Sequence, residues 1–131
     1  MTIYLCLDDR KGLQFNKRRL SRDAAVLEDL RRELPGTLTI EAFSEKLIAG
    51  AGIPCTVAEE IPADAHFFCE SKKAEGLLPL AEKLVIYWWN RHYPADLRWE
   101  AEPAEFGFVL SETLDFPGKS HETITKEVYV K

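Results

Sequence analysis

The sequence has few cysteines, no long apolar run and no excess of basic residues, and each shortage narrows the class of protein. Its three cysteines, Cys6, Cys55 and Cys69, are odd in number and show no CxxC spacing, which fits a reduced cytoplasmic compartment better than a disulfide framework. No apolar stretch approaches the roughly 20 residues of a membrane-spanning helix. The amino terminus also lacks the basic region of a signal peptide. We therefore expect a cytoplasmic protein without a membrane partner.

The formal net charge of -5 argues against general nucleic-acid binding, because neutralising phosphates needs a basic face. One local basic segment runs from Arg10 to Arg22 and contains Arg10, Lys11, Lys17, Arg18, Arg19 and Arg22. Either this segment is a solvated loop, or it serves a protein- or nucleic-acid-interaction module.

The 131 residues predict a single domain, organised around the apolar run Leu84–Trp89. This run shows no alternation, which indicates a central strand covered on both faces. Further strands are predicted at Ile3–Leu7, Thr37–Ile40, Ile53–Ala58 and Asp64–Cys69, and helices at 22–34, Phe43–Ala49 and Lys72–Leu78. Alternating strands and helices predict parallel pairing, whereas Phe106–Leu110 and His121–Val130 predict an antiparallel edge hairpin. Ser21 is the expected N-cap of the first helix, after an irregular loop marked by Gly12 and Asn16.

Several segments, in order along nearly the whole chain, resemble those of the dihydrofolate reductase family. They are Gly12 with Leu20-Ser21-Arg22-Asp23, Leu78-Pro79-Leu80-Ala81 leading into Leu84-Val85-Ile86, Pro94-Ala95-Asp96 with Trp99, Glu102-Pro103 with Phe106, and Ser120-His121-Glu122 through Glu127-Val128-Tyr129. The resemblance implies one three-layer α/β domain over residues 1–131, with a mostly parallel central sheet, an antiparallel C-terminal edge hairpin and helices on both faces. The middle of the chain is shorter by about one strand-helix unit.

The chain is also similar to short bacterial proteins that sometimes carry a ribonuclease Z label. That activity needs an H-x-H-x-D-H metal cluster, whereas His66, His92 and His121 are isolated in this sequence. We therefore expect no metal site.

The family resemblance implies that Asp23 is the carboxylate that holds a pterin ring and assists its protonation. Tyr87 stands where the family has a threonine linked to that carboxylate, and its phenol can make the same hydrogen bond. The alternatives are structural: Asp23 as a first-turn residue favoured by the helix dipole, and Tyr87 as a core aromatic.

The same resemblance argues against NADPH as a cofactor, and we expect none. Where the family has a Gly-Gly pair that lets the cofactor pyrophosphate approach, this chain reads Cys69-Glu70-Ser71. Where the family has Gly-Arg-x-Thr, with the arginine clamping a phosphate, it reads Glu41-Ala42-Phe43-Ser44. The arginine is absent, and Ser44 stands at the position of the threonine.

Polar residues on two segments are the further candidates for ligand binding. Asn16, Arg18 and Arg19 are expected to converge with Asp23 on an anionic or polar ligand. Asn90 and Arg91 lie just past the central strand, where ligands bind in open α/β sheets. His121 has general-base chemistry available, but its chain neighbours Ser120 and Glu122 point to the opposite face of a strand and cannot form a relay with it.

Taken together, these features predict binding of a small polar ligand, pterin-like or nucleotide-like, in a cleft around Asp23, with or without chemistry. One alternative is a divergent oxidoreductase of the dihydrofolate reductase type. Another is a protein- or nucleic-acid-interaction module. A strand edge left exposed by the missing unit would be a reason to form a homodimer.

Overall fold

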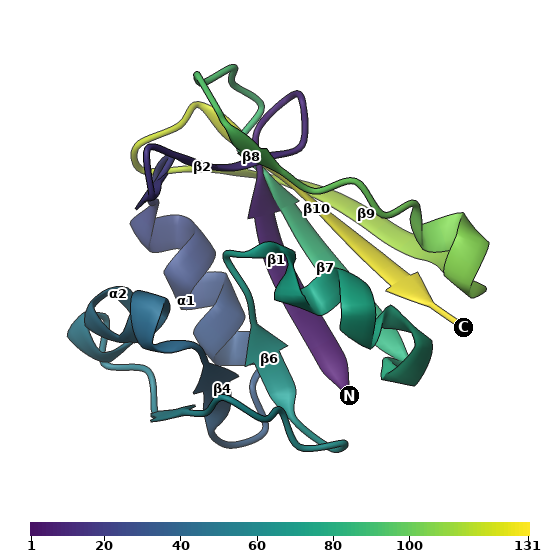
Figure 1. Ribbon diagram of the computed structural model, residues 1–131. Coiled ribbons are helices and arrows are strands. Elements are labelled where there is room, and N and C mark those ends of the chain that lie inside the picture. Colours follow the sequence, from purple (N-terminus) through teal and green to yellow (C-terminus); the bar gives the residue numbers. More distant parts are fainter.

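The computed structural model describes residues 1–131, and its centre is a seven-stranded sheet in the order β5-β4-β6-β1-β7-β10-β9 (Figure 1). The strands of this sheet are β1 (Thr2–Leu7), β4 (Leu38–Ile40), β5 (Cys55–Val57), β6 (His66–Phe68), β7 (Lys83–Trp88), β9 (Val109–Pro117) and β10 (Thr123–Val130). The first five pair in parallel, while β10 runs antiparallel to both β7 and β9. The predicted mostly parallel sheet with an antiparallel edge hairpin is confirmed.

Helical segments cover both faces of this sheet. The helices α1 (Ala24–Glu33) and α2 (Glu45–Gly50), the latter preceded by the 3₁₀ helix η1 (Ala42–Ser44), lie on one face. The other face is covered by the 3₁₀ helices η2 (Lys72–Leu80) and η3 (Pro103–Phe106). Because successive side chains of a strand point to opposite faces, Leu5 packs into one apolar cluster and Tyr4 into the other. The fold therefore has three layers.

The start of α1 differs from the sequence-based prediction. Its N-cap is Asp23, whose extended backbone places the side chain to accept a hydrogen bond from the N–H of Ala25 at 2.8 Å. Ser21, the predicted cap, is used elsewhere. The helix ends at Glu33, just before the breaker pair Pro35-Gly36, as the sequence predicts.

The segment expected to be a loop supplies two strands of a second, three-stranded sheet. This sheet consists of β3 (Arg18–Arg19), β2 (Gly12–Phe15) and β8 (Leu97–Arg98), in that order. Asn16 and Lys17 join β2 to β3 with φ values of 51° and 62°, the left-handed conformation that tight two-residue hairpin turns require. The expectation of an irregular loop here is wrong.

The predicted strand Phe106–Leu110 is also misplaced. Phe106 ends η3, and Gly107 follows with a φ of 85°. The strand itself begins at Val109 and continues to Pro117. This strand, β9, and β5 are the two edges of the main sheet. β9 carries the exposed apolar side chains of Val109, Leu110 and Leu114; homodimer formation stays a prediction.

Helix α1 is tied to the sheet by a buried polar cluster. The Lys126 ammonium on β10 lies 2.7 Å from Oδ2 of Asp29 and 2.5 Å from Oε1 of Glu33. The Tyr87 hydroxyl on β7 donates to the same Oδ2 of Asp29 at 2.7 Å. Burial opposes the charge of Asp29, yet the hydrogen bonds from Lys126 and Tyr87 hold its pKa below the ordinary value. The expected hydrogen bond between Tyr87 and Asp23 is therefore wrong, because Asp29 takes that proton.

We expect Lys126→Met to lower the free energy of unfolding by about 3 kcal/mol, because it leaves the buried Asp29 carboxylate without its cation. Urea denaturation at neutral pH measures this change. The matched control is Lys119→Met, which removes a 2.7 Å ion pair with Glu28 on the exposed surface and should have no measurable effect. Equal effects of the two substitutions would contradict the assignment.

Candidate functional site

Asp23 holds two distant parts of the chain together through its buried carboxylate. Oδ1 accepts hydrogen bonds from the backbone N–H groups of Ala25 at 2.8 Å and Lys119 at 2.9 Å. Oδ2 accepts from the N–H groups of Ser120 at 2.8 Å and His121 at 3.0 Å, and lies 3.0 Å from Nδ1 of the His121 ring. One side chain thus joins the start of α1 to the turn between β9 and β10.

This environment keeps Asp23 charged. Burial opposes ionisation, but the N–H of Lys119, the His121 ring and the N–H of Ser120 outweigh it and lower the pKa of Asp23 to about 2. A carboxylate facing an imidazole nitrogen holds the ring proton on that nitrogen. Nδ1 of His121 therefore carries the proton, and in the neutral ring Nε2 is free to accept one.

The Nε2 side of His121 faces two hydroxyl groups. Ser21 Oγ lies 3.1 Å from Nε2, and the Tyr93 hydroxyl lies 2.8 Å from it. The Tyr93 hydroxyl also donates to Ser21 Oγ at 3.2 Å. Ser21 comes from the segment between β3 and α1, and Tyr93 from the loop after β7. Ser21, His121 and Asp23 form a continuous hydrogen-bonded line of hydroxyl, imidazole and carboxylate.

The position of His121 is fixed by packing as well as by hydrogen bonds. Its ring stacks on Trp89 with centroids 4.7 Å apart and planes at 17°. The preceding turn contains Gly118, where a Cβ would lie 2.7 Å from Oδ2 of Asp23 and 2.5 Å from the His121 carbonyl oxygen. Only glycine fits at this position, because the turn must approach the carboxylate this closely.

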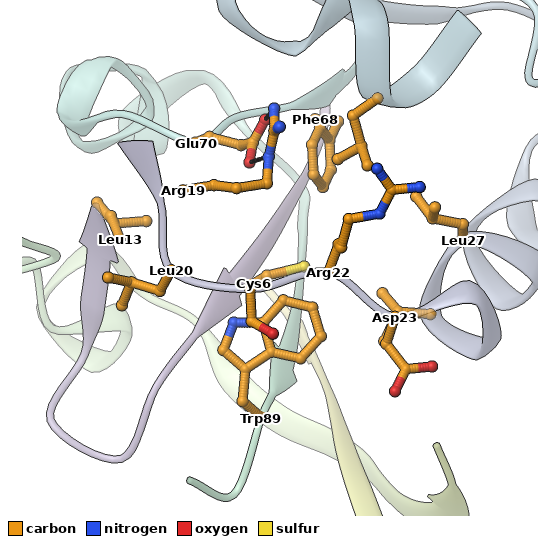
Figure 2. Close-up of a pocket in the computed structure, with 13 residues that line it drawn as sticks. Cys6, Leu13, Arg19, Leu20, Arg22, Asp23, Leu27, Phe68, Glu70 and Trp89 are labelled. Carbon is orange, nitrogen blue, oxygen red and sulfur yellow. Dashed lines mark hydrogen bonds and ion pairs between the residues drawn. The ribbon is translucent and has the colours of Figure 1, made fainter. Parts of the chain in front are cut away.

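A pocket opens beside this line at the carboxyl ends of β1, β6 and β7, and its wall includes Cys6 of β1, Phe68 of β6 and Trp89 directly after β7 (Figure 2). Eight of its 13 lining residues are hydrophobic, and the 13 are Cys6, Leu13, Arg19, Leu20, Ser21, Arg22, Asp23, Val26, Leu27, Leu47, Phe68, Glu70 and Trp89. Its free volume is about 20 Å³, enough for roughly one water molecule. The Arg22 side chain extends across it toward Leu27, and the Asp23 carboxylate points away from it (Figure 2).

One wall of the pocket is an internal ion pair. Arg19 donates from Nε to Oε2 of Glu70 at 2.8 Å and from a terminal nitrogen to Oε1 at 2.9 Å. The Ser44 hydroxyl donates to the same Oε1 at 2.7 Å, and the Arg19 guanidinium lies 5.2 Å from the centre of the Phe43 ring. Bidentate geometry and burial of Glu70 make this a rigid wall.

The structure brings together only part of the predicted binding set. Arg19 and Asp23 line the pocket, whereas Asn16 and Arg18 line an open hollow of about 370 Å³ next to it, which shares Arg19 and Leu20 with the pocket and also includes Tyr93. The predicted convergence of all four residues on one ligand is therefore not found.

The remaining predicted residues lie at other places. Asn90 and Arg91 line a third hollow, of about 270 Å³, together with His121. The Asn90 amide is occupied by β10, since it donates to the Thr123 carbonyl and to Thr125 Oγ1. Ser44 lies behind the pocket wall and bonds to Glu70 rather than facing the cavity.

Sequence reasoning missed the roles of Ser21, Tyr93, Trp89 and Cys6 and dismissed a relay at His121. The chain neighbours of His121 do not form a relay with it; its partners Asp23 and Ser21 lie 98 and 100 positions away in the sequence. The one available signal was the spacing of Ser21 and Asp23, two positions apart at a helix start. The Cys6 thiol also lines the pocket, and burial first of all, followed by the charge of Glu70, raises its pKa well above the ordinary value.

No protein-family model and no curated protein matches the sequence. Among solved structures, the chain is similar to dihydrofolate reductase from Enterococcus faecalis complexed with NADP(H) and RAB-propyl, at a TM-score of 0.69 and 12% identity. The similarity covers 99% of this chain and 95% of that one. The predicted dihydrofolate-reductase-like fold is confirmed, and at this level of identity the comparison shows the fold alone. None of the helices combines the length and the apolar character that a membrane-spanning helix needs.

We expect Asp23→Asn to destabilise the protein by about 2 kcal/mol at neutral pH, because the lowered pKa measures how much better the folded state binds the charged carboxylate. The pKa of about 2 in the folded state lies below the ordinary aspartate value of 3.8. Asp23 therefore contributes its full stabilisation above the unfolded pKa and loses it as pH falls through the folded one.

Urea denaturation at pH 7 and at points down to pH 2 measures the free energy of unfolding of Asp23→Asn and of the natural sequence. The difference between them should shrink as the pH falls from about 4 toward 2. Asp64→Asn, at an exposed position without a hydrogen-bonded side chain, is the control and should show no difference at either end. A difference in the free energy of unfolding that stays constant from pH 7 to pH 2 would contradict the charge assigned to Asp23.

Proposed function

We propose that this dihydrofolate-reductase-like protein binds a small polar ligand, pterin-like or nucleotide-like, in the pocket beside Asp23, and that it does not use NADPH. The observation that carries the proposal is the pocket itself, with apolar walls and an arginine across it. Its place at the carboxyl ends of parallel strands is where ligands bind in open α/β sheets.

The lining of the pocket selects the ligand chemistry. Phe68 and Trp89 offer aromatic surface to a flat ring. The Arg22 side chain is exposed and makes neither a hydrogen bond nor an ion pair within the chain. A free guanidinium binds carboxylate or phosphate oxygens through two charge-assisted hydrogen bonds. A ring with one anionic substituent fits this combination.

Entry of such a ring requires Arg22 to move. The free volume of about 20 Å³ is smaller than any aromatic ring, and the Arg22 side chain extends across the space (Figure 2). Because Arg22 has no partner to release, its outward rotation breaks no hydrogen bond. Asp23 stays in place during this motion, since every acceptor position of its carboxylate is filled, and its part in binding is to hold the pocket wall.

The proposed lack of NADPH binding is supported by the Arg19–Glu70 pair. The structure of the enterococcal enzyme contains NADP(H), whereas this chain places a buried glutamate where the family resemblance implies two glycines. Its side chain closes that approach, and Arg19 and Ser44 hold it there. Displacing it would leave Arg19 without its carboxylate partner, which is costly in a partly buried pair.

A thermal-shift series with folates, pterins, nucleotides and NADPH tests the proposal. A ligand at 100 times its dissociation constant stabilises a protein by about 2.7 kcal/mol, which gives a clear rise in Tm. Arg22→Ala should weaken binding of the anionic ligand about 10- to 100-fold, because a charge-assisted hydrogen bond is lost. Arg98→Ala, at an exposed arginine on β8 that does not line the pocket, is the matched control.

Each outcome decides between the functions considered. A shift with NADPH would overturn the proposed loss of that site and favour the oxidoreductase alternative. A shift only with RNA, lost at high salt, would favour the interaction module. Binding of the anionic ligand unchanged in Arg22→Ala would contradict the role of the arginine.

A further inference from the structure

We propose that Ser21 is a nucleophile, that His121 is its general base, and that the pocket takes the acyl group of a short-chain ester, which the protein hydrolyses. This inference rests on the proposed function in one respect, since it assigns a substrate class to the same pocket. Nothing in the dihydrofolate reductase resemblance implies it.

The geometry is that of an activated serine. A serine hydroxyl is a weak nucleophile unless a base within about 2.6–3.2 Å removes its proton and a third group orients that base. Ser21 Oγ lies 3.1 Å from Nε2 of His121, and Nδ1 of the same ring lies 3.0 Å from the Asp23 carboxylate. The serine hydroxyl and the carboxylate meet opposite nitrogens of one imidazole, as proton transfer through the ring requires.

The hydrogen-bonded line of Ser21, His121 and Asp23 is preorganised, because buried groups hold it in place. His121 is 5% exposed and Asp23 is 1% exposed, and the stacked Trp89 ring prevents the imidazole from turning. A buried, ionised carboxylate stabilises the imidazolium that forms when Ser21 loses its proton, and it does so more strongly than it would in water. Asp23 is therefore a positioning residue that acts through His121.

Tyr93 supplies a donor for the carbonyl oxygen. Its hydroxyl donates to Ser21 Oγ at 3.2 Å, so it lies beside the atom that attacks. Its backbone N–H is anchored to Oδ2 of the buried Asp8 at 3.0 Å, which fixes the loop that carries it. When Oγ bonds to a carbonyl carbon, the carbonyl oxygen becomes the negative atom next to this hydroxyl, and a tyrosine hydroxyl is an effective donor to it.

The size of the pocket limits the acyl group. While Arg22 lies across the space, a free volume of about 20 Å³ among apolar side chains holds one water-sized group, such as the methyl of an acetyl group, and excludes a long chain. The larger part of the ester lies in the adjoining open hollow of about 370 Å³, which Tyr93 and Leu20 border. The substrate class is thus a short acyl ester, above all an acetate, with a bulky alcohol portion.

The reaction proceeds in two balanced steps. Ser21 Oγ forms a bond to the carbonyl carbon while His121 Nε2 takes its proton; the C–O bond of the ester then breaks and the alcohol leaves with that proton. Water next attacks the acyl-serine, gives a proton to His121, and releases the carboxylic acid as Oγ regains a proton. Water is the only co-reactant.

Hydrolysis of p-nitrophenyl acetate by the purified protein is the test, with the butyrate and octanoate esters for chain length. We expect an acetyl group on Ser21, located by mass spectrometry of peptides from the protein quenched during turnover, and rates that fall from acetate to octanoate. Ser21→Ala and His121→Gln should lower kcat by about 10²- to 10⁴-fold. Asp23→Asn should lower kcat with KM little changed, and by more than the folded fraction measured by urea denaturation accounts for, which a merely structural residue would not do. Ser111→Ala, an exposed serine on β9, is the control with full activity.

The result that overturns the inference is full hydrolysis by Ser21→Ala, or an acetyl group found on Cys6 or on lysines alone. Ser21→Ala removes one oxygen from a half-buried side chain, and its fold is checked by its thermal unfolding. Ligand binding separates this inference from the proposed function: the anionic ligand should still raise the Tm of Ser21→Ala. Binding without acylation in the natural sequence would refute the hydrolase alone, and neither binding nor acylation would refute both.

Discussion

The charge on one buried carboxylate, that of Asp23, is the constraint on which the rest of the structure depends. Burying an ion costs several kcal/mol unless donors surround it. Four backbone N–H groups and one ring N–H meet Asp23, and they come from the first turn of α1 and from residues 119–121. The turn can supply three of those amides only because Gly118 lets it pass beside the carboxylate. A local cap of a helix has thereby become the link between the two ends of the chain.

A second polar cluster makes this link rigid along the whole helix. Asp29 lies in the middle of α1 and Glu33 at its end, and both bind Lys126 on β10. Both ties therefore lead from α1 to the same C-terminal hairpin, one to its turn and one to its inner strand. The apolar residues Val26 and Leu30 press the helix onto the sheet but specify no register along it. The charged pairs of Lys126 with Asp29 and Glu33 supply that register.

The sequence predicts the layers of this fold well because burial determines where apolar residues stand along the chain. The unbroken apolar run before Asn90 is a buried central strand, and the helix breakers after Glu33 end α1 where expected. The small sheet around β2 was missed because its turn, Asn16-Lys17, adopts positive φ values without the glycine that usually signals such a turn. The misplaced N-cap has a related cause. Ser21 and Asp23 are both good caps, and only the hairpin turn and His121, about a hundred residues away, determine that the aspartate caps the helix while the serine faces the imidazole.

The sequence predicts only part of the candidate site, because contacts between residues far apart in the chain determine this geometry too. The resemblance to dihydrofolate reductases assigns Asp23 to the ligand, and a carboxylate with free acceptor positions would serve that role. Here its acceptor positions are filled from within the chain, so the groups left facing the pocket are its neighbours Ser21 and Arg22. The fold keeps the carboxylate at the strand ends, but the direction of its hydrogen bonds decides what the pocket can do. Because its carboxylate points away from the pocket, Asp23 makes no direct contact with a ligand ring; in the proposed hydrolysis it instead orients the imidazole of His121 toward Ser21.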